Sequence, residues 1–276
     1  MSKTIPLATE SLKLNLKELQ EIETEILRSV VAICHAHNLT YYLVYGSALG
    51  TIRHAGPIPW DYDVDIAIPY PELERFLEIM RAQLPQKYYV NYNDNDPNYP
   101  ELFPRIGLHS YSTKTLHLDV FLLIGAPNDQ KKHKKFKNRA KTCWFLYKFK
   151  NFNPVHFGEF KSLKQKLFAP AIKTLLWPFP KPWVKRKFKS LCEAYPFDQA
   201  NLVVNAQFGY SMKEFIPKEY YAEGAVHSYA GMEVRIPKEH HRYLRHIYGD
   251  YMQFPSEKNR QTPDYYIITK QDTNNL

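Results

Sequence analysis

The sequence contains few cysteines and no long apolar run. Its three cysteines, Cys34, Cys143 and Cys192, are odd in number and far apart in 276 residues, which argues against a disulfide framework or a CxxC metal site. No stretch reaches the roughly 18 apolar residues of a membrane-spanning helix. The first residues also lack the apolar core and cleavage site of a signal peptide. We therefore expect buried thiols in a folded protein located in the cytoplasm.

Positive charge is concentrated in one part of the chain. The net charge is +9, but residues 131–190 hold 18 Lys and Arg against one acid, Glu159, which gives +17. The remaining 19 basic and 27 acidic residues give −8. This segment also contains Trp144, Trp177 and Trp183, three of the four tryptophans. Basic residues mixed with Trp, Phe and Leu are typical of an amphipathic helix that lies in the headgroup layer of an anionic membrane.

Two other interpretations of the basic segment remain open. Nucleic acid is the competing partner for such a patch, but no helix-turn-helix, RNA-recognition or zinc-finger pattern accompanies it, so an anionic membrane surface is favoured. A solvated helical hairpin is the third interpretation, in which lysine side chains extend along an apolar surface with their charged ends in water.

Alternating acids mark the most informative stretch of the sequence. Asp61, Asp63 and Asp65 stand at every second position of DYDVDIAI, so on a strand they project from one face while apolar side chains project from the other. Like charges this close raise each other's pKa unless a cation lies among them. Mg²⁺ prefers carboxylate oxygens together with substrate phosphates. The alternative is that these acids only line an exposed strand edge.

A second apolar strand is expected at Leu116 to Leu123, which reads LHLDVFLL. It carries one acid, Asp119, on the same face as His117, while the alternate leucines and valine face the core. A single carboxylate in an otherwise apolar strand is a candidate fourth metal ligand. Residues 102–108 are expected to form a further strand that bears Arg105.

The stretch GSALGTIRHAGPIPWDYDVDIAI, residues 46–68, resembles the hallmark of the LicD/fukutin-like phosphotransferase family. The resemblance extends to ICHAHNLTYYL before it, to DVF at 119–121, and to EVRIP and YLRHIYGDYMQFP near the C-terminus. It covers most of residues 16–128 and 215–260. It implies an α+β fold, a nucleotidyltransferase-like mixed sheet with flanking helices and a basic helical insertion.

We expect three parts along the chain. Residues 1–128 would form the catalytic core, 129–200 the basic aromatic insertion, and 201–276 a C-terminal part that completes the core. Within the first part, residues 11–37 have the apolar spacing of a helix, and residues 41–45 are strand-like. Gly46 would then allow a tight turn that brings backbone N–H groups close to a phosphate, and the alternative is a plain hairpin turn or the turn that starts a helix.

The resemblance implies a metal-dependent phosphotransferase, because bacterial members of the family move phosphocholine from CDP-choline to cell-surface glycans. The expected donor is a CDP-linked alcohol, and the expected acceptor is a hydroxyl of lipopolysaccharide, capsule or teichoic acid. Asp63, Asp65 and Asp119 are expected to be catalytic and, with Asp61, to hold Mg²⁺ or Mn²⁺ against the diphosphate. Asp119 would take the proton of the acceptor hydroxyl, and CMP would leave. The expected donor-binding residues are Gly46, Ser47, Arg53, His54 and Arg105.

Several alternatives accompany this interpretation. A conventional nucleotidyltransferase would use the same acids but release pyrophosphate, and a non-catalytic basic adaptor would need no metal. Arg53, His54 and Arg105 have a simpler interpretation as surface or solvated side chains, and Asp250 either reaches the active site or caps a turn.

The tail lacks the histidine that often ends the family pattern, and Tyr62 stands where many bacterial members have an acid. Both departures concern the acceptor and the fine specificity. We expect the protein on the inner face of the cytoplasmic membrane, where docking would suit a lipid-linked or membrane-proximal acceptor.

Overall fold

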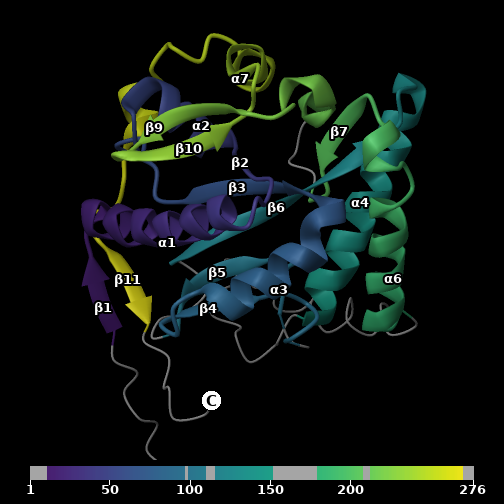
Figure 1. Cartoon of the computed structure of the whole chain (residues 1–276), viewed down its shortest axis with the longest axis horizontal. Coiled ribbons are helices and arrows are strands. Elements are labelled where there is room, and N and C mark those ends of the chain that lie inside the picture. Colours follow the sequence, from purple (N-terminus) through teal and green to yellow (C-terminus); the bar gives the residue numbers. More distant parts are fainter. Residues whose placement is uncertain (1–10, 97–98, 110–115, 152–178, 208–211, 270–276) are drawn as a thin grey trace, which may run out of the picture.

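A mixed β-sheet forms the centre of the molecule (Figure 1). The computed structural model describes residues 11–96, 99–109, 116–151, 179–207 and 212–269. Five strands run in the order β2-β3-β6-β5-β4, and β7 pairs with β6 and then with β8. The strands are β2 (Tyr42–Leu43), β3 (Val64–Pro69), β4 (Tyr88–Asn91), β5 (Arg105–Leu108), β6 (His117–Ala126), β7 (Leu202–Asn205) and β8 (Ile216–Pro217). The expected mixed sheet is confirmed.

Strand β6 organises the sheet, since it has neighbours along its whole length. It runs parallel to β3 and antiparallel to both β5 and β7, which share its other edge. Leu118, Val120 and Leu122 are fully buried, as the alternation in the sequence predicts. The opposite face of this strand carries His117 and Asp119.

Two helices cover one face of the sheet, α1 (Leu16–Ala36) and α3 (Leu73–Gln83) (Figure 1). The helix predicted at 11–37 begins later than expected. The Asn15 side chain accepts the Glu18 N–H at 3.0 Å while the Glu18 carboxylate accepts the Asn15 N–H at 2.8 Å, a reciprocal cap that fixes the first turn. The preceding residues form β1 (Ser11–Leu14), which pairs antiparallel with β11 (Tyr266–Thr269).

The region around Gly46 and the acids also differs from the prediction. The strand expected at 41–45 is only the two residues of β2, and helix α2 (Tyr45–His54) begins directly after it. Gly46 and Ser47 therefore lie in the first turn of a helix, which is the helix-start alternative for this position. The Tyr45 N–H donates to the Tyr243 hydroxyl at 3.1 Å, and this contact with a distant part of the chain helps to hold the start of the helix.

Only one of the three alternating acids lies on a strand. Strand β3 begins at Val64, so Asp61 and Asp63 precede it. The Asp61 N–H donates to the Ile58 carbonyl at 2.9 Å, and the Tyr62 N–H donates to Asp61 Oδ1 at 3.2 Å. These local hydrogen bonds hold a turn where a continuous strand was predicted.

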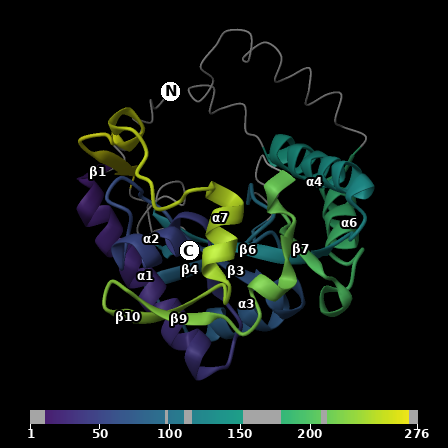
Figure 2. The same cartoon turned by 90° about the horizontal axis from the view of Figure 1, so that it is seen from above.

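In its described residues, the basic segment forms the helices α4 (Gln130–Asn151) and α6 (Lys181–Cys192), which pack against each other (Figures 1 and 2). Apolar residues from both, such as Phe136 and Val184, are buried in the main core. Trp144 and Trp183 are partly buried and pack against the same core, whereas Trp177 lies outside the described residues.

The remaining elements stand above the β2 edge of the sheet (Figure 1). They are the hairpin β9 (Ala225–Tyr229) and β10 (Met232–Ile236) and the helix α7 (His240–Tyr248). Short 3-10 helices occur at Tyr70–Glu72, Phe197–Gln199, Met212–Glu214, Lys218–Tyr220 and Glu257–Arg260. Across the described ranges, no helix combines the length and apolarity needed to cross a bilayer.

Candidate active site

The register of the sheet brings three charged residues into one row. Asp65 on β3 is the direct neighbour of Asp119 on β6, and Asp119 is in turn opposite Arg105 on β5. Residues in register on adjacent strands point to the same face and lie about 5 Å apart. We call Asp65, Asp119 and Arg105 the charged row. Two carboxylates predicted from separate parts of the sequence thus lie side by side.

Two basic side chains hold Asp119. Arg105 Nε lies 2.8 Å from Asp119 Oδ1, and His117 Nε2 lies 3.2 Å from the same oxygen. Burial alone would raise the pKa of Asp119, but the hydrogen bond from His117 and the Arg105 guanidinium outweigh it and lower this pKa. Asp119 is therefore negatively charged at neutral pH. Arg105, predicted as a phosphate contact, is engaged with this carboxylate.

Asp65 is in the opposite electrostatic situation. Burial raises its pKa well above the usual value, and the carboxylates of Asp63 and Asp119 raise it further. Its backbone N–H donates to Ser47 Oγ at 2.8 Å. Ser47 is itself buried in the first turn of α2, so this residue ties the helix start to the strand that carries the acid.

The turn before β3 is held by helix α1. The Gln20 side-chain amide donates to the carbonyls of Ile58 at 2.9 Å and Asp61 at 2.6 Å. Burial, followed by the repulsion of Asp63, raises the pKa of Asp61 to about 7. Crowded carboxyl groups of this kind are stabilised when a cation binds among them.

Glu23 on α1 is a further acid in this cluster, and it was not singled out from the sequence. Its side chain is only 1% exposed, and its oxygens meet no hydrogen-bond partner of good geometry among the described residues. Burial, then Asp63 and Asp65, raise its pKa well above the usual value. Its position four residues after Leu19 and three before Ile26 places it on the apolar face of the helix. An acid at a position where the apolar spacing of the helix predicts burial was the sequence signal that could have identified Glu23.

A small cavity lies between these acids and the start of α2. Glu23, Asp61, Asp63, Gly46 and Ser47 contribute to its lining, and its volume is about 10 Å³, close to that of a single water-sized probe. A Cβ on Gly46 would lie 2.6 Å from Asp61 Oδ2, so glycine allows this close approach of helix and acid.

The donor set fits a hard divalent cation by its chemistry. Carboxylate oxygens are the ligands that Mg²⁺ prefers, and the buried side chain of Glu23 lines the same cavity as Asp61 and Asp63. Within the part of the chain that the structure describes, no group of three or more His, Cys, Asp or Glu side chains stands ready to hold a metal. Asp65 and Asp119 are neighbours in the sheet, and Glu23, Asp61 and Asp63 line one cavity.

Arg53 and His54 lie beside the acids, in an aromatic cluster. The Arg53 guanidinium donates to the Tyr251 carbonyl at 2.9 Å and lies 4.9 Å from the centre of the Phe254 ring. The His54 ring contacts Trp60 and Phe254, each at 5.8 Å between centroids. The C-terminal stretch YMQFP thus packs on the residues predicted to bind phosphate.

Tyr248, at the end of α7, feels the charge of both Arg53 in this cluster and the acids. Burial and the negative charge of Asp65 raise the pKa of its phenol, whereas Arg53 lowers it. Asp250, whose role was left open, is exposed, and its carbonyl accepts the Gln253 N–H at 3.2 Å in a turn.

A mixed sheet with acids at the start of one strand and on its parallel neighbour, next to a helix N-terminus, defines a nucleotidyltransferase-type protein. A family model described as LicD/FKTN/FKRP, nucleotidyltransferase domain, matches residues 38–170. The chain therefore carries a LicD-family nucleotidyltransferase domain, as its sequence motifs predicted.

Known relatives extend this similarity. The lipopolysaccharide cholinephosphotransferase LicD of Haemophilus influenzae is 26% identical over 266 residues, which cover 90% of this chain and 96% of that protein. The mouse ribitol 5-phosphate transferase FKRP is 31% identical over 111 residues, 34% of this chain and 22% of that protein. The human protein of the same name is 50% identical over 44 residues, 16% of this chain and 9% of that protein.

Proposed function

We propose that this protein transfers a phospho-alcohol group, phosphocholine from CDP-choline, to a hydroxyl of a cell-surface glycan such as lipopolysaccharide, capsule or teichoic acid. The observation that carries the proposal is the charged row beside the cavity lined by Asp61 and Asp63, within a LicD-family domain. Similarity along nearly all of the Haemophilus protein supports this reaction type and a glycan acceptor.

The reaction is a displacement at the phosphorus atom that bears the alcohol. The acceptor oxygen forms a new bond to this phosphorus, while the anhydride bond breaks and CMP leaves with the bridging oxygen. Asp61, Asp63, Asp65 and Asp119, with Glu23 beside them, would hold Mg²⁺ or Mn²⁺. The metal, when bound, neutralises charge on the attacking and leaving oxygens. The proton of the acceptor hydroxyl passes to a carboxylate, for which we propose Asp119.

The other predicted residues bind or position the donor in this proposal. Gly46 and Ser47 present a first helical turn, where backbone N–H groups favour phosphate. Arg105 holds the charge and orientation of Asp119. Arg53 and His54, in their aromatic cluster, would contact the donor.

Asp119→Asn is expected to weaken Mg²⁺ binding by about tenfold or more, because it removes a carboxylate that Arg105 and His117 keep in its ionised form. Isothermal calorimetry with MgCl₂ measures the effect. Asp94→Asn is the matched control, since Asp94 also pairs with an arginine, Arg81, at 2.7 Å but stands on the surface. An equal loss of Mg²⁺ affinity in the two variants would show that Asp119 is not a metal ligand.

The products of the reaction test the proposed function. Incubation with CDP-choline, Mg²⁺ and acceptor glycan is expected to release CMP, and incubation with CTP is expected to release no pyrophosphate. Pyrophosphate release would favour a conventional nucleotidyltransferase. A chain that binds neither Mg²⁺ nor nucleotide would be a basic adaptor instead. Mass spectrometry of the glycan from a deletion strain would identify the alcohol and the acceptor.

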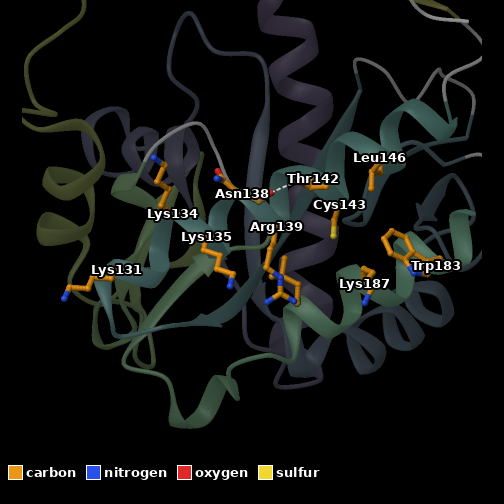
Figure 3. Close-up of a pocket in the computed structure, with 11 residues that line it drawn as sticks. Lys131, Lys134, Lys135, Asn138, Arg139, Thr142, Cys143, Leu146, Trp183 and Lys187 are labelled. Carbon is orange, nitrogen blue, oxygen red and sulfur yellow. Dashed lines mark hydrogen bonds between the residues drawn. The ribbon is translucent and has the colours of Figure 1, made fainter. Parts of the chain in front are cut away.

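A basic groove between α4 and α6 supports peripheral membrane binding (Figure 3). Its volume is about 670 Å³. The α4 residues in its lining recur at spacings of three and four, so they form one stripe along the helix. The cationic side chains in the lining are Lys131, Lys134, Lys135, Arg139 and Lys187, and the apolar side chains are Leu146, Trp183 and Leu191. We propose that this groove takes anionic headgroups on the inner face of the cytoplasmic membrane.

Vesicle co-sedimentation is expected to show binding to anionic vesicles that exceeds binding to neutral vesicles. Changing Lys134, Lys135 and Arg139 to glutamate should reduce it by about tenfold or more, since each basic residue near the surface contributes about 1 kcal/mol. The electrostatic share should fall as salt rises above ~0.15 M, where the Debye length is about 8 Å.

A second triple change supplies the charge-matched control. Lys238, Arg242 and Lys258 are exposed and lie outside the groove, so changing them to glutamate should leave vesicle binding near the wild-type level. Equal binding to neutral and anionic vesicles, or equal losses in both triples, would contradict a docking role for the groove.

A further inference from the structure

A second hollow, of about 590 Å³, opens beside the charged row. This volume lies within the range of small-molecule sites. Asp65 contributes to its lining, so the hollow adjoins the proposed site of phosphoryl transfer. We call it the aromatic pocket, because its lining includes Tyr45, Phe121, Trp144, Phe145 and Tyr248. These side chains come from α2, β6, α4 and α7, four elements that are far apart in the sequence.

A carboxylate belongs to the same lining. Glu214 is only 8% exposed, and the Tyr45 hydroxyl donates to its Oε2 at 3.2 Å. Asn205 Nδ2 donates to the Tyr45 hydroxyl at 3.3 Å. The Tyr45 ring meets Phe121 edge to face, with 5.8 Å between centroids. The pocket therefore combines aromatic rings with an acid that is held in place by hydrogen bonds.

Aromatic rings and a carboxylate are the groups that recognise a quaternary ammonium ion. The negative faces of the rings attract a cation, and this attraction is strongest where water is excluded. A trimethylammonium group donates no hydrogen bond, so it is recognised by charge and by contact of its methyl groups. A polyol such as ribitol instead needs several polar partners. The lining also contains the amides Asn205 and Gln207, of which Asn205 donates to the Tyr45 hydroxyl. Lys141, also in the lining, is exposed and suits the phosphates of the donor.

We infer that the aromatic pocket binds the cationic head group of the transferred alcohol, a quaternary ammonium such as that of choline. The inference rests on the proposed function, since it assigns the head group of the same donor. The phosphate attached to the alcohol would then lie near Asp65, which belongs to the charged row and also lines the pocket. The pocket thereby selects cationic alcohols over neutral polyols.

A neutral isostere separates recognition of charge from recognition of shape. In CDP-3,3-dimethylbutanol a tert-butyl group replaces the trimethylammonium group. Calorimetry with Mg²⁺ should show that the wild-type protein binds CDP-choline ~10-fold more tightly than this analogue. In Glu214→Gln this preference should narrow to about threefold, because the rings still attract the cation, while the affinity for CDP stays at the wild-type value. Glu219→Gln, an exposed acid outside the pocket, should change none of these affinities.

Phe145→Ala provides a second variant, because Phe145 is 42% exposed and its removal leaves the core intact. It should weaken binding of CDP-choline by ~5-fold without changing the affinity for CDP. Equal wild-type affinities for CDP-choline and the analogue would overturn the inference. An equal loss of CDP and CDP-choline in Glu214→Gln would also overturn it, because the pocket would then hold the nucleotide. CMP release from CDP-choline in either case would leave the proposed function standing, whereas no CMP release by the wild-type protein would contradict that function.

Discussion

Replacing Asp63 or Asp65 by asparagine is expected to lower the transfer rate by about a thousandfold or more, ~4 kcal/mol in the activation barrier, while the protein stays folded. Asparagine keeps the shape of the side chain but removes a charge that a divalent cation needs. The Asp65 N–H can still donate to Ser47 Oγ, because this hydrogen bond uses the backbone. The initial rate of CMP release at saturating donor measures the effect.

The thermal stability of the same variants supplies an independent readout. Asp63 raises the pKa of both Asp61 and Asp65 by charge repulsion, so its neutralisation should raise the melting temperature of the metal-free protein. Asp94→Asn is the control and should keep wild-type activity. A variant that keeps more than about a tenth of the wild-type rate, a loss below ~1.4 kcal/mol, would not have lost a metal ligand.

Replacing Arg105 by methionine is expected to destabilise the fold by about 3–5 kcal/mol. The change removes the guanidinium from Asp119 and leaves His117 as the basic group that the structure places against this buried carboxylate. Breaking a buried ion pair has a cost of this size. Both side chains are only 17% exposed. The melting temperature should fall by roughly 10 °C, at the 2–4 °C per kcal/mol expected for a chain of this length. Differential scanning calorimetry in metal-free buffer measures the change.

Two further variants distinguish an unpaired charge from lost packing. Arg81→Met breaks the pair between Arg81 and Asp94, whose side chains are 33% and 45% exposed, so it should cost less than ~1 kcal/mol. The double variant Arg105→Met, Asp119→Leu removes both charges and should recover most of the lost stability, since apolar replacements of buried pairs are often neutral. A double variant as unstable as Arg105→Met would contradict this account.

The strands that carry the site were predictable because alternation is a local property. The LHLDVFLL pattern identified Asp119 as the one acid of an apolar strand, and β6 buries Leu118, Val120 and Leu122 completely. Sequence motifs likewise identified the acids before β3. The row formed by Asp65, Asp119 and Arg105 depends on register between three strands, which no single segment encodes.

What the sequence did not predict depends on contacts between distant residues. The start of helix α2 was one of two alternatives at Gly46, and the sequence did not decide between them because the first residue of the helix is held by Tyr243, which is far along the chain. Glu23 and Glu214 resemble ordinary acids of a helix and a loop until the fold encloses them. Trp144 matched a membrane-surface composition, yet it lies partly buried against the core and lines the aromatic pocket, since composition does not determine what a ring faces.

The pairing of β6 with β7 has a consequence for the evolution of specificity. The chain leaves the sheet at Ala126 and returns at Leu202, and these two residues are direct partners across the antiparallel pair. The segment between them therefore begins and ends at neighbouring positions of the sheet, and its described helices α4 and α6 pack in the main core. This segment carries α4 and so contributes Trp144 and Phe145 to the aromatic pocket, whereas Asp65 and Asp119 lie outside it. On the inferred role of the aromatic pocket, an exchange of residues 127–201 is expected to change the alcohol that is selected, while Asp65 and Asp119 keep their places in the sheet.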